Sequence, residues 1–435
     1  MARLLEGIRV LDLSSIWAAP LGTRWLADMG AEVIKVQEVP KLTPQMIQRM
    51  QAMQQAQASG ARSPAAGGGG YVQELEGNKR SISLDFETPK GQELLRRLVA
   101  ISDVLVDNHR PVVLERSHLD YEDLRQIKPD IIVVRVTAMG ATGPERNYSG
   151  FGATIDGLSG LAFHTGYPYE DEPMRSGINY ADPVVGMHVG GAVMLALVHR
   201  QRTGEGQNVD VGLRDSTITQ LGELFMDYSM NHRFAPRLGN RELGLAPHGA
   251  YRTRGEDRWI TIAVNSDDEW RALSRVMGGP DWTQEERFRD MHGRWQNHDE
   301  LDALINDWTQ GQDATELAER LQAAGVAATP VLTVPEIFNT PQHQARDWWH
   351  MMQQPDGTAY HYYGPGWKLP ETPVEILTPP PPYGQDNRSV YQGLLGLSDE
   401  EYAQLVEEKV VSESQYPTLP PGMTLPPPGG AAPRS

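Results

Sequence analysis

The chain has 435 residues, a formal net charge of -18 at pH 7, 39% hydrophobic residues and 22% charged residues. This length predicts two or more domains, and the acidic balance argues against a nucleic-acid partner, because phosphate backbones bind basic surfaces. The absence of cysteine excludes disulfides, thiolate metal ligands and cysteine nucleophiles. Without a signal-peptide pattern or a run of about 18 apolar residues, the sequence predicts a cytoplasmic protein with no membrane partner.

The N-terminal part has the pattern of a strand–helix–strand unit. An apolar strand pattern at 7–15 is followed by a helix pattern at 18–30 and a second strand pattern at 31–37. Such a unit implies a parallel sheet that is covered by helices. Residues 40–77, rich in Gln, Ala and Gly, then break the pattern and predict a surface excursion.

The alternation of strands and helices resumes after this excursion. Capping signals support it, among them Thr88 followed by Pro89 at the start of a helix. The predicted strands are 79–86, 103–108, 130–140 and 207–213, and the predicted helices are 88–102, 121–128 and 182–204. The sequence therefore predicts an α/β fold with a Rossmann-like, doubly wound large domain.

A smaller domain is predicted after this alternation. The large domain takes residues 1–225, and residues 226–340, with short strands and amphipathic helices of their own, form a smaller α+β domain. Residues 341–410 predict a linker and return segment that completes the large domain, with a strand at 364–373. The Pro- and Gly-rich residues 411–435 predict a disordered tail.

One acid, Asp182, stands at the start of the long apolar helix, and the next residue able to carry charge is His188. The helix dipole favours an ionised carboxylate at this end, which predicts a low pKa for Asp182. An ionised, accessible carboxylate is a usable nucleophile toward an acyl group. For an Asp-Pro step a simple helix cap is the commoner role, and the spacing alone leaves both interpretations open.

Familiar catalytic motifs are missing from the sequence. It contains no G-x-S-x-G, Walker-type phosphate loop, H-E-x-x-H or G-x-G-x-x-G, and its twelve histidines show no metal-ligand spacing, so no metal site is predicted. Polar segments instead follow the predicted strands: SSIWAAP, DNHRP and TAMGATGP. Because doubly wound sheets bind ligands outside the carboxyl ends of their strands, these segments predict the binding edge.

Four long segments carry a resemblance to a known family. They read LEGIRVLDLSSIWAAPLGTRWLADMGAEVIKV, NKRSISLDFETPKGQELLRRLVAISDVLVDNHRP, RVTAMGATGP and ADPVVGMHVGGAVMLALVHRQRTGEGQNVDVGLRDS. In this order they resemble the class III CoA-transferases, which include formyl-CoA transferase, carnitine CoA-transferase and the α-methylacyl-CoA racemases. The segments cover most of residues 4–216, and GN at 239–240 with PHGAYRT extends the match more weakly.

The resemblance implies that Asp182 is the catalytic nucleophile, forming first an aspartyl mixed anhydride and then an aspartyl-CoA thioester. It also implies that coenzyme A and acyl-CoA are substrates and not permanently bound cofactors. The implied partners are acyl-CoA, a small carboxylic acid and a second copy of the chain in an interlocked homodimer. The residues that it places against CoA are Ile16, Trp17, Ala18, Lys79, Asn108, His109, Arg116 and Gly140. Lys79 and Arg116 would supply positive charge for the phosphates, and backbone amides near Gly140 would be oxyanion donors.

Three departures from the family pattern stand beside this match. Glu38 occupies a position where the family often has Arg, Thr137 stands at the place of a family Lys, and a glycine-run lid has no counterpart in the sequence. An α-methylacyl-CoA racemase is one alternative, but Phe151 replaces the His base of the racemases, and the nearby His164 is out of place. A non-catalytic CoA-binding relative is the other alternative, and the presence of Asp182 argues against it.

Overall fold

The computed structural model describes residues 3–41, 74–353, 357–376 and 378–417. Contacts within the chain define two compact units: the larger holds residues 1–159, 177–222 and 349–435, and the smaller holds residues 160–176 and 223–348. Most of the excursion predicted at 40–77 and most of the predicted tail lie outside the described residues.

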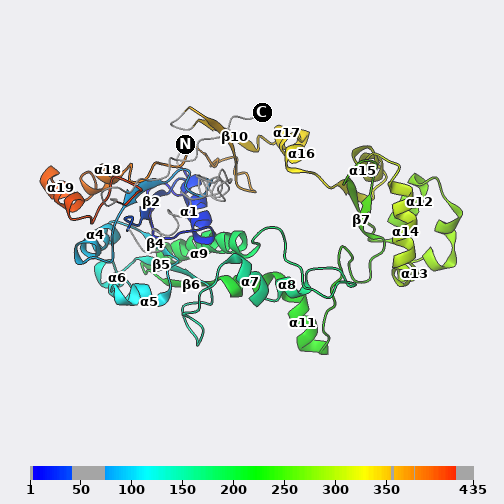
Figure 1. Cartoon of the computed structure of the whole chain (residues 1–435), viewed down its shortest axis with the longest axis horizontal. Helices are drawn as coiled ribbons and strands as arrows, with labels where there is room; N and C mark the ends of the chain where they lie inside the picture. The colour runs from blue at the N-terminus through cyan, green and yellow to red at the C-terminus, as the bar shows by residue number, and fades with distance from the viewer. Residues whose placement is uncertain (1–2, 42–73, 354–356, 377, 418–435) are drawn as a thin grey trace, which may run out of the picture. The chain divides into compact units, whose positions relative to one another are not determined.

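The larger unit contains a six-stranded parallel sheet in the order β3-β2-β1-β4-β5-β6 (Figure 1). Its strands are β1 (Arg9–Asp12), β2 (Glu32–Gln37), β3 (Arg80–Ser83), β4 (Val104–Asp107), β5 (Ile132–Thr137) and β6 (Asn208–Gly212). Each strand lies inside a segment that the sequence predicts as a strand, so the predicted parallel α/β sheet is confirmed. The strand order reverses between β1 and β4, where doubly wound sheets bind ligands at the carboxyl ends of their strands.

Both faces of this sheet are buried, because successive side chains of a strand point to opposite faces. Val10 of β1 and Val134 of β5 belong to one core, whereas their sequence neighbours Leu11 and Val133 belong to the other. The first face is covered by α1 (Ala18–Asp28), α7 (Gly152–Leu158), α9 (Ala181–Thr203) and α10 (Leu213–Ile218). The second face is covered by α4 (Pro89–Ala100), α5 (Pro111–Arg116), α6 (Tyr121–Ile127), α18 (Asn387–Tyr391) and α19 (Asp399–Glu407).

Helices α1 and α9 approach each other closely because glycines lie at their contact. A Cβ atom on Gly186 would lie 3.0 Å from the carbonyl oxygen of Ala18, and one on Gly22 would lie 2.9 Å from the carbonyl oxygen of Gly186. In the sequence, Gly186, Gly190 and Gly191 of this helix predict close packing of backbone against backbone. The structure confirms this prediction for Gly186. The prediction is wrong for Gly190, which has an ordinary contact at 3.7 Å, and for Gly191, which faces open space.

Helix α9 is long and apolar enough to pass a length and composition test for a membrane span. Its best 18-residue window has a mean hydropathy of 1.6, and half of that window is buried inside the protein. Val185, Val189 and Val193 are fully buried in the core that α9 shares with α1 and the sheet. A core helix of this kind passes the same test on its composition.

The C-terminal part of the larger unit differs from the prediction. An antiparallel hairpin, β10 (Trp349–Gln353) and β11 (Ala359–Tyr363), is followed by residues 364–373 without a strand. The strand predicted at 364–373 is wrong, because Pro365, Pro370 and Pro373 lack the N–H groups that a ladder requires.

The smaller unit is built on a three-stranded antiparallel sheet in the order β7-β8-β9. Its strands are β7 (His248–Arg252), β8 (Trp259–Ala263) and β9 (Ala327–Pro330). Its helices are α8 (Leu161–His164), α11 (Gly222–Asn231), α12 (Asp267–Val276), α13 (Met291–Gln296), α14 (His298–Thr309), α15 (Ala314–Ala323), α16 (Val334–Phe338) and α17 (Pro341–Ala345). Short 3₁₀ turns lie at Asp281–Gln284 and Glu286–Phe288, and a third, Thr219–Leu221, precedes α11.

Residues 160–176 belong to this smaller unit, although the sequence assigned them to the large domain. The backbone amide of Gly239 donates to the carbonyl of Gly166, and the Arg237 guanidinium donates to the carbonyls of Phe163 and Glu170. These bonds join segments that lie about seventy residues apart in the chain, a pairing that local sequence patterns do not encode.

Candidate active site

Asp182 lies in the first turn of α9, and its residue is 5% exposed. Tyr180 occupies the N-cap position, and its side chain makes no capping hydrogen bond. The amide of Ala181 donates instead to Oδ1 of Asp156, at 3.2 Å. The carboxylate that accepts a hydrogen bond from the first amide of α9 therefore belongs to Asp156. Asp182 does not cap the helix, so a capping role does not explain its presence.

The pKa of Asp182 is raised to about 6, first by burial and second by the negative charge of Asp156. The low pKa that the helix dipole predicted is therefore wrong, because desolvation and a second carboxylate outweigh the dipole. In the described parts of the chain, no cation or hydrogen bond offsets these two effects on Asp182. A buried carboxyl group with a raised pKa and no stabilising partner is typical of functional sites.

The position of Asp182 follows from the contact between α1 and α9. Gly186 packs against the first turn of α1 at Ala18, and Asp182 lies one helical turn before Gly186 on the same face of α9. Helix α1 begins beyond the carboxyl end of β1, the strand that it follows, and the contact of Gly186 with Ala18 brings the start of α9 to the same place. Asp182 is thus at the edge of the sheet where the loop after β1 enters α1.

That loop carries three of the predicted CoA residues. Ile16 is 66% exposed and has a φ of 75°, a left-handed conformation that is rare for a β-branched residue. Trp17 is half-buried at the N-cap of α1, and Ala18 is buried in its first turn. An exposed apolar side chain held in a strained turn indicates a surface shaped for a ligand.

Asn108 follows β4 and fixes this loop. Its side-chain Oδ1 accepts from the amide of Ser15 at 2.9 Å, and its Nδ2 donates to the carbonyl of Ser15 at 2.7 Å. The two bonds tie the loop after β1 to the loop after β4 across the point where the strand order reverses. The structure therefore brings Ile16, Trp17 and Asn108 together.

His109 lies between two carboxylates at the same edge. Its Nδ1 is 2.5 Å from Oδ1 of Asp107, and its Nε2 is 3.3 Å from Oε1 of Glu38. Burial would lower the pKa of His109, but its hydrogen bonds to Asp107 and Glu38 outweigh burial and raise the pKa to about 10. Glu38, which stands where the family often has an Arg, thus pairs with His109 from the loop after β4.

Lys79 does not fit the expected contact with a phosphate. It immediately precedes β3, and its side chain is fully buried. Its ammonium lies 3.1 Å from Asp12 and 3.0 Å from Glu76. These carboxylates raise the pKa of Lys79 against the opposing effect of burial. Lys79 is an internal ion-pair partner in this structure.

Arg116 and Gly140 have different surroundings. Arg116 is exposed at the end of α5. Gly140 follows β5 with a φ of 88° and lies near the carboxylate of Asp210, which accepts a hydrogen bond from Ala141 at 2.9 Å. An oxyanion beside this carboxylate would be repelled, so the geometry disfavours the oxyanion role expected near Gly140.

Two residues that border Asp182 were not predicted from the sequence. Asp156 and Gly152 both lie on α7, and a Cβ atom on Gly152 would lie 2.0 Å from Oδ2 of Asp182. The only signal in the stretch YSGFGATIDGLSG is an acid four residues after a glycine, a spacing that places both on one face if the stretch is helical. Their contact with Asp182 could not be read from it, because it depends on how α7 packs on α9.

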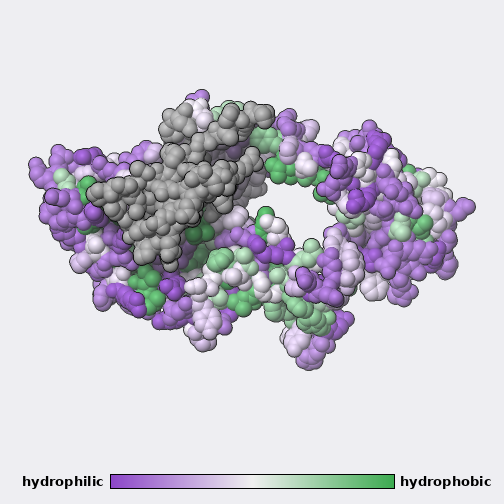
Figure 2. All heavy atoms as spheres, viewed as in Figure 1, coloured by the Kyte–Doolittle hydropathy of each residue, from purple (hydrophilic) through white to green (hydrophobic). Residues whose placement is uncertain are grey.

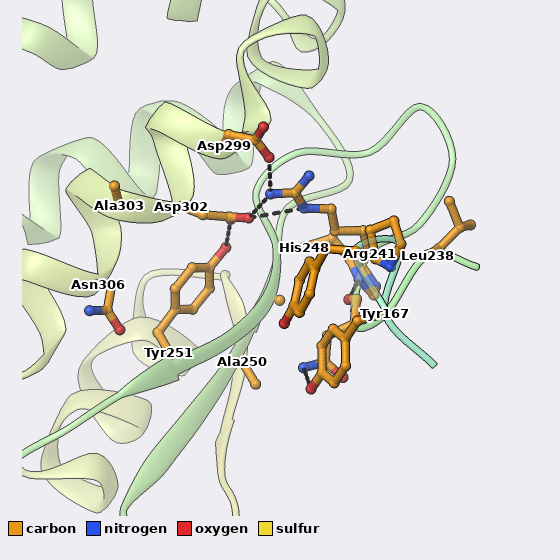
Figure 3. Close-up of a pocket in the computed structure, with 14 residues that line it drawn as sticks. Tyr167, Leu238, Arg241, His248, Ala250, Tyr251, Asp299, Asp302, Ala303 and Asn306 are labelled. Atoms are coloured by element: carbon orange, nitrogen blue, oxygen red, sulfur yellow. Dashed lines mark hydrogen bonds and ion pairs between the residues drawn. The ribbon is translucent and has the colours of Figure 1, made fainter. Parts of the chain in front are cut away.

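The smaller unit holds a separate polar pocket of about 390 Å³. Arg241 is hydrogen-bonded to Asp302 and paired with Asp299, and the Tyr251 hydroxyl donates to Asp302 at 2.8 Å (Figure 3). Tyr167 and His248 face the same space. His164, the alternative base for a racemase, belongs to this unit and packs against the rings of Phe163 and Phe234.

The profile of CoA-transferase family III matches residues 5–387. The succinyl-CoA–D-citramalate CoA-transferase of Chloroflexus aurantiacus is 32% identical over 409 residues, which cover 94% of this chain and 98% of that protein. The succinate–glutarate CoA-transferase of Agrobacterium fabrum is 32% identical over 89% of this chain and 94% of its own. A CAIB/BAIF family protein of Brucella suis has a crystal structure with a TM-score of 0.76 at 29% identity, covering 91% of this chain and 100% of that one.

The chain therefore belongs to the class III CoA-transferases, enzymes that move CoA from an acyl-CoA to a carboxylate.

Proposed function

We propose that Asp182 carries out this transfer as the nucleophile. Its carboxylate attacks the thioester carbonyl, the C–S bond breaks, and CoA leaves as a thiolate from an aspartyl mixed anhydride. The thiolate attacks the aspartyl carbonyl, which releases the donor acid as a carboxylate and leaves an aspartyl-CoA thioester. The acceptor carboxylate then attacks this thioester, and the same two steps run in reverse to give the new acyl-CoA and free Asp182.

These steps consume no water and conserve the number of thioesters and carboxylates. The overall exchange is therefore nearly balanced in free energy, and the protein has mainly to hold the thiolate near the anhydride and exclude water. The observation that carries the proposal is the buried Asp182 carboxyl group with its pKa of about 6, at the edge where the loop after β1 is held by Asn108.

We place the CoA nucleotide at the same edge of the larger unit. The exposed Arg116 would supply positive charge to a phosphate there, and the half-buried Trp17 and exposed Ile16 would offer apolar surface to the pantetheine. His109 would contribute a contact but no net positive charge, because Asp107 and Glu38 already balance its charge. Lys79 is left out of this site, because its ammonium is buried with Asp12 and Glu76.

Succinyl-CoA is the donor that we expect, with a four- or five-carbon dicarboxylic acid as acceptor. The two named relatives, at 32% identity over most of this chain, are a succinyl-CoA–D-citramalate and a succinate–glutarate transferase. The test is to incubate the purified enzyme with succinyl-CoA and either glutarate, citramalate or acetate, and to measure each new CoA thioester by mass spectrometry. Asp182→Asn is the control. Transfer by the wild type and its loss in this variant support the proposal, whereas equal transfer by both would refute the role of Asp182.

The homodimer also belongs to this proposal. Helix α9 exposes Met187, Leu195 and Val198, at 51%, 74% and 41%, and hydrophobic side chains gather over α11 (Figure 2). Phe225 and Met230 of α11 are 48% and 70% exposed. Apolar surface of this kind is typical of faces that a second chain covers. Light scattering at micromolar concentration should give twice the chain mass of 48.3 kDa, and a monomer that retains full activity would refute the dimer.

A further inference from the structure

Helix α7 presents two residues on one face toward the first turn of α9. Gly152 and Asp156 are four residues apart in α7, and residues with this spacing share a helix face. We propose that they are positioning residues for Asp182: Asp156 anchors the start of α9 so that the Asp182 carboxylate is not used as a cap, and Gly152 leaves the space that this carboxylate occupies. The inference rests on the proposed role of Asp182 as nucleophile.

Asp156 is placed to anchor the helix. It is 1% exposed, and its Oδ1 accepts the hydrogen bond of the Ala181 amide at 3.2 Å. Ala181 is the first residue of α9, where amides have no partner within the helix. Because Asp156 comes from another helix, it satisfies this end of α9 without involving the side chain of Asp182, one residue further along.

Gly152 is the first residue of α7, and the absence of a side chain there is required by the site. A Cβ atom would lie 2.0 Å from Oδ2 of Asp182 and 2.6 Å from Cβ of Asn179. No real side chain tolerates such distances, so any larger residue must displace the carboxylate or the segment before α9. By contrast, a Cβ atom on Gly157 of the same helix would meet nothing within 4 Å.

The charge of Asp156 also sets the pH range in which Asp182 is ionised. Among the charged residues on elements that pack against α9 in the described chain, Asp156 is the one that changes the pKa of Asp182, acting after burial and in the same direction. The charged residues on those elements that leave it unchanged are Arg24 and Asp28 of α1, Arg135 of β5, Asp210 of β6 and Arg214 and Asp215 of α10.

Asp156→Asn tests the proposed role of Asp156 most directly. The amide oxygen of Asn still accepts from Ala181, so the helix start is kept while the charge is removed. The acid limb of kcat against pH, measured with saturating succinyl-CoA and acceptor, should move to lower pH by roughly 0.5 to 1 unit. Asp156→Ala, which removes the acceptor too, should lower kcat further. An unchanged acid limb in the Asn variant would overturn the electrostatic role.

Gly152→Ala tests the proposed role of Gly152, and Gly157→Ala is the matched control on the same helix. Gly152→Ala should lower kcat by about 100-fold or more, because a displacement of about 1 Å is enough to misplace a nucleophile. Gly157→Ala should keep kcat within about twofold and raise the melting temperature slightly, since alanine favours a helix. Equal kcat in the two variants would overturn the steric role. If Gly152→Ala does not fold, the pH profile of Asp156→Asn decides whether α7 acts on Asp182.

Failure of this inference can be told from failure of the proposed function. If Asp182 is not the nucleophile, Asp182→Asn retains transfer, and the variants on α7 have no reason to act through it. If Asp182 is the nucleophile but α7 does not position it, Asp182→Asn abolishes transfer while Asp156→Asn and Gly152→Ala behave like the wild type.

Discussion

Asp12 and Asp182 are both buried, and their carboxylates have opposite surroundings. Asp12 accepts hydrogen bonds from Ser14 and Thr23 and lies within 3.5 Å of two lysine ammonium groups. These interactions outweigh burial and hold its pKa well below the usual range. Asp182 has burial and a neighbouring carboxylate, which raise its pKa to about 6. The first acid stabilises the fold, whereas the ionised form of the second lowers stability, and the second is the acid that we propose as the nucleophile.

Asp182→Asn should therefore stabilise the protein while it abolishes transfer. The folded pKa of about 6 lies above the ordinary value of 3.8, so the folded state loses stability as the pH rises from about 4 through about 6. The Asn variant has no such loss. At pH 7 its free energy of unfolding should be higher by up to ~3 kcal/mol, because two units of pKa correspond to this energy. The gain should fade below pH 4, and thermal melts of both proteins from pH 3.5 to 8 measure it. A gain independent of pH would contradict the raised pKa.

Lys79→Ala should destabilise the protein and leave the KM for acyl-CoA unchanged. The substitution leaves Asp12 buried without one of its two cations, a loss that costs about 3–5 kcal/mol for buried pairs. Lys90→Ala, which removes an exposed ion pair with Glu408, is the control and should melt like the wild type. Denaturant unfolding and initial rates measure the two effects. A raised KM for acyl-CoA with normal stability would show that Lys79 does contact the nucleotide.

Arg116→Ala should have the opposite effect: it should raise the KM for acyl-CoA and leave stability unchanged. Its side chain is exposed at the end of α5, so stability should not change. Loss of a charge-assisted phosphate contact costs ~1.5–3 kcal/mol, which would raise the KM for acyl-CoA by roughly ten- to a hundredfold at constant kcat. Dephospho-CoA thioesters serve as the control, because they lack one of the phosphates. An unchanged KM with both thioesters would show that the nucleotide does not bind at α5.

At the scale of elements, the sequence predicted what depends on local pattern. The strands of the large sheet and the start of α4 at Thr88, whose hydroxyl accepts from Gly91, are confirmed. The strand at 364–373 was wrong because apolar residues there are interrupted by proline. Site features that depend on packing were also missed, since neither the burial of Lys79 nor the contact of Gly152 with Asp182 has a local signal.

Gly186→Ala should disturb the contact of α1 and α9, and Gly191→Ala should not. A Cβ atom on Gly186 would lie 3.0 Å from the carbonyl oxygen of Ala18, the first residue of α1 after the loop that follows β1. We expect a lower melting temperature and a raised KM for acyl-CoA. Gly191 faces open space on the same helix, where alanine should add about 0.5–1 kcal/mol of stability. Similar melting temperatures for both variants would contradict the close packing of these helices.

At the scale of the whole molecule, the net charge of -18 has to be reconciled with the proposed site for an anionic substrate. Asp12 is paired internally with Lys35 and Lys79, and Asp107 is paired with His109, so these acids do not act as free negative charges. The exposed Arg116 is left as the cation that we propose for the phosphates. The overall charge argues against nucleic acid as a partner, which stays a prediction, and it carries no information about this edge. Local arrangement decides which anion binds.

The central claim is that CoA becomes attached to Asp182 during transfer. The enzyme should be incubated with succinyl-CoA without an acceptor, quenched with hydroxylamine, digested and analysed by mass spectrometry. We expect a hydroxamate on Asp182, formed from the aspartyl thioester or anhydride, and its disappearance when glutarate is added before the quench. A modified residue other than Asp182, or rapid turnover with no modified residue, would contradict the claim.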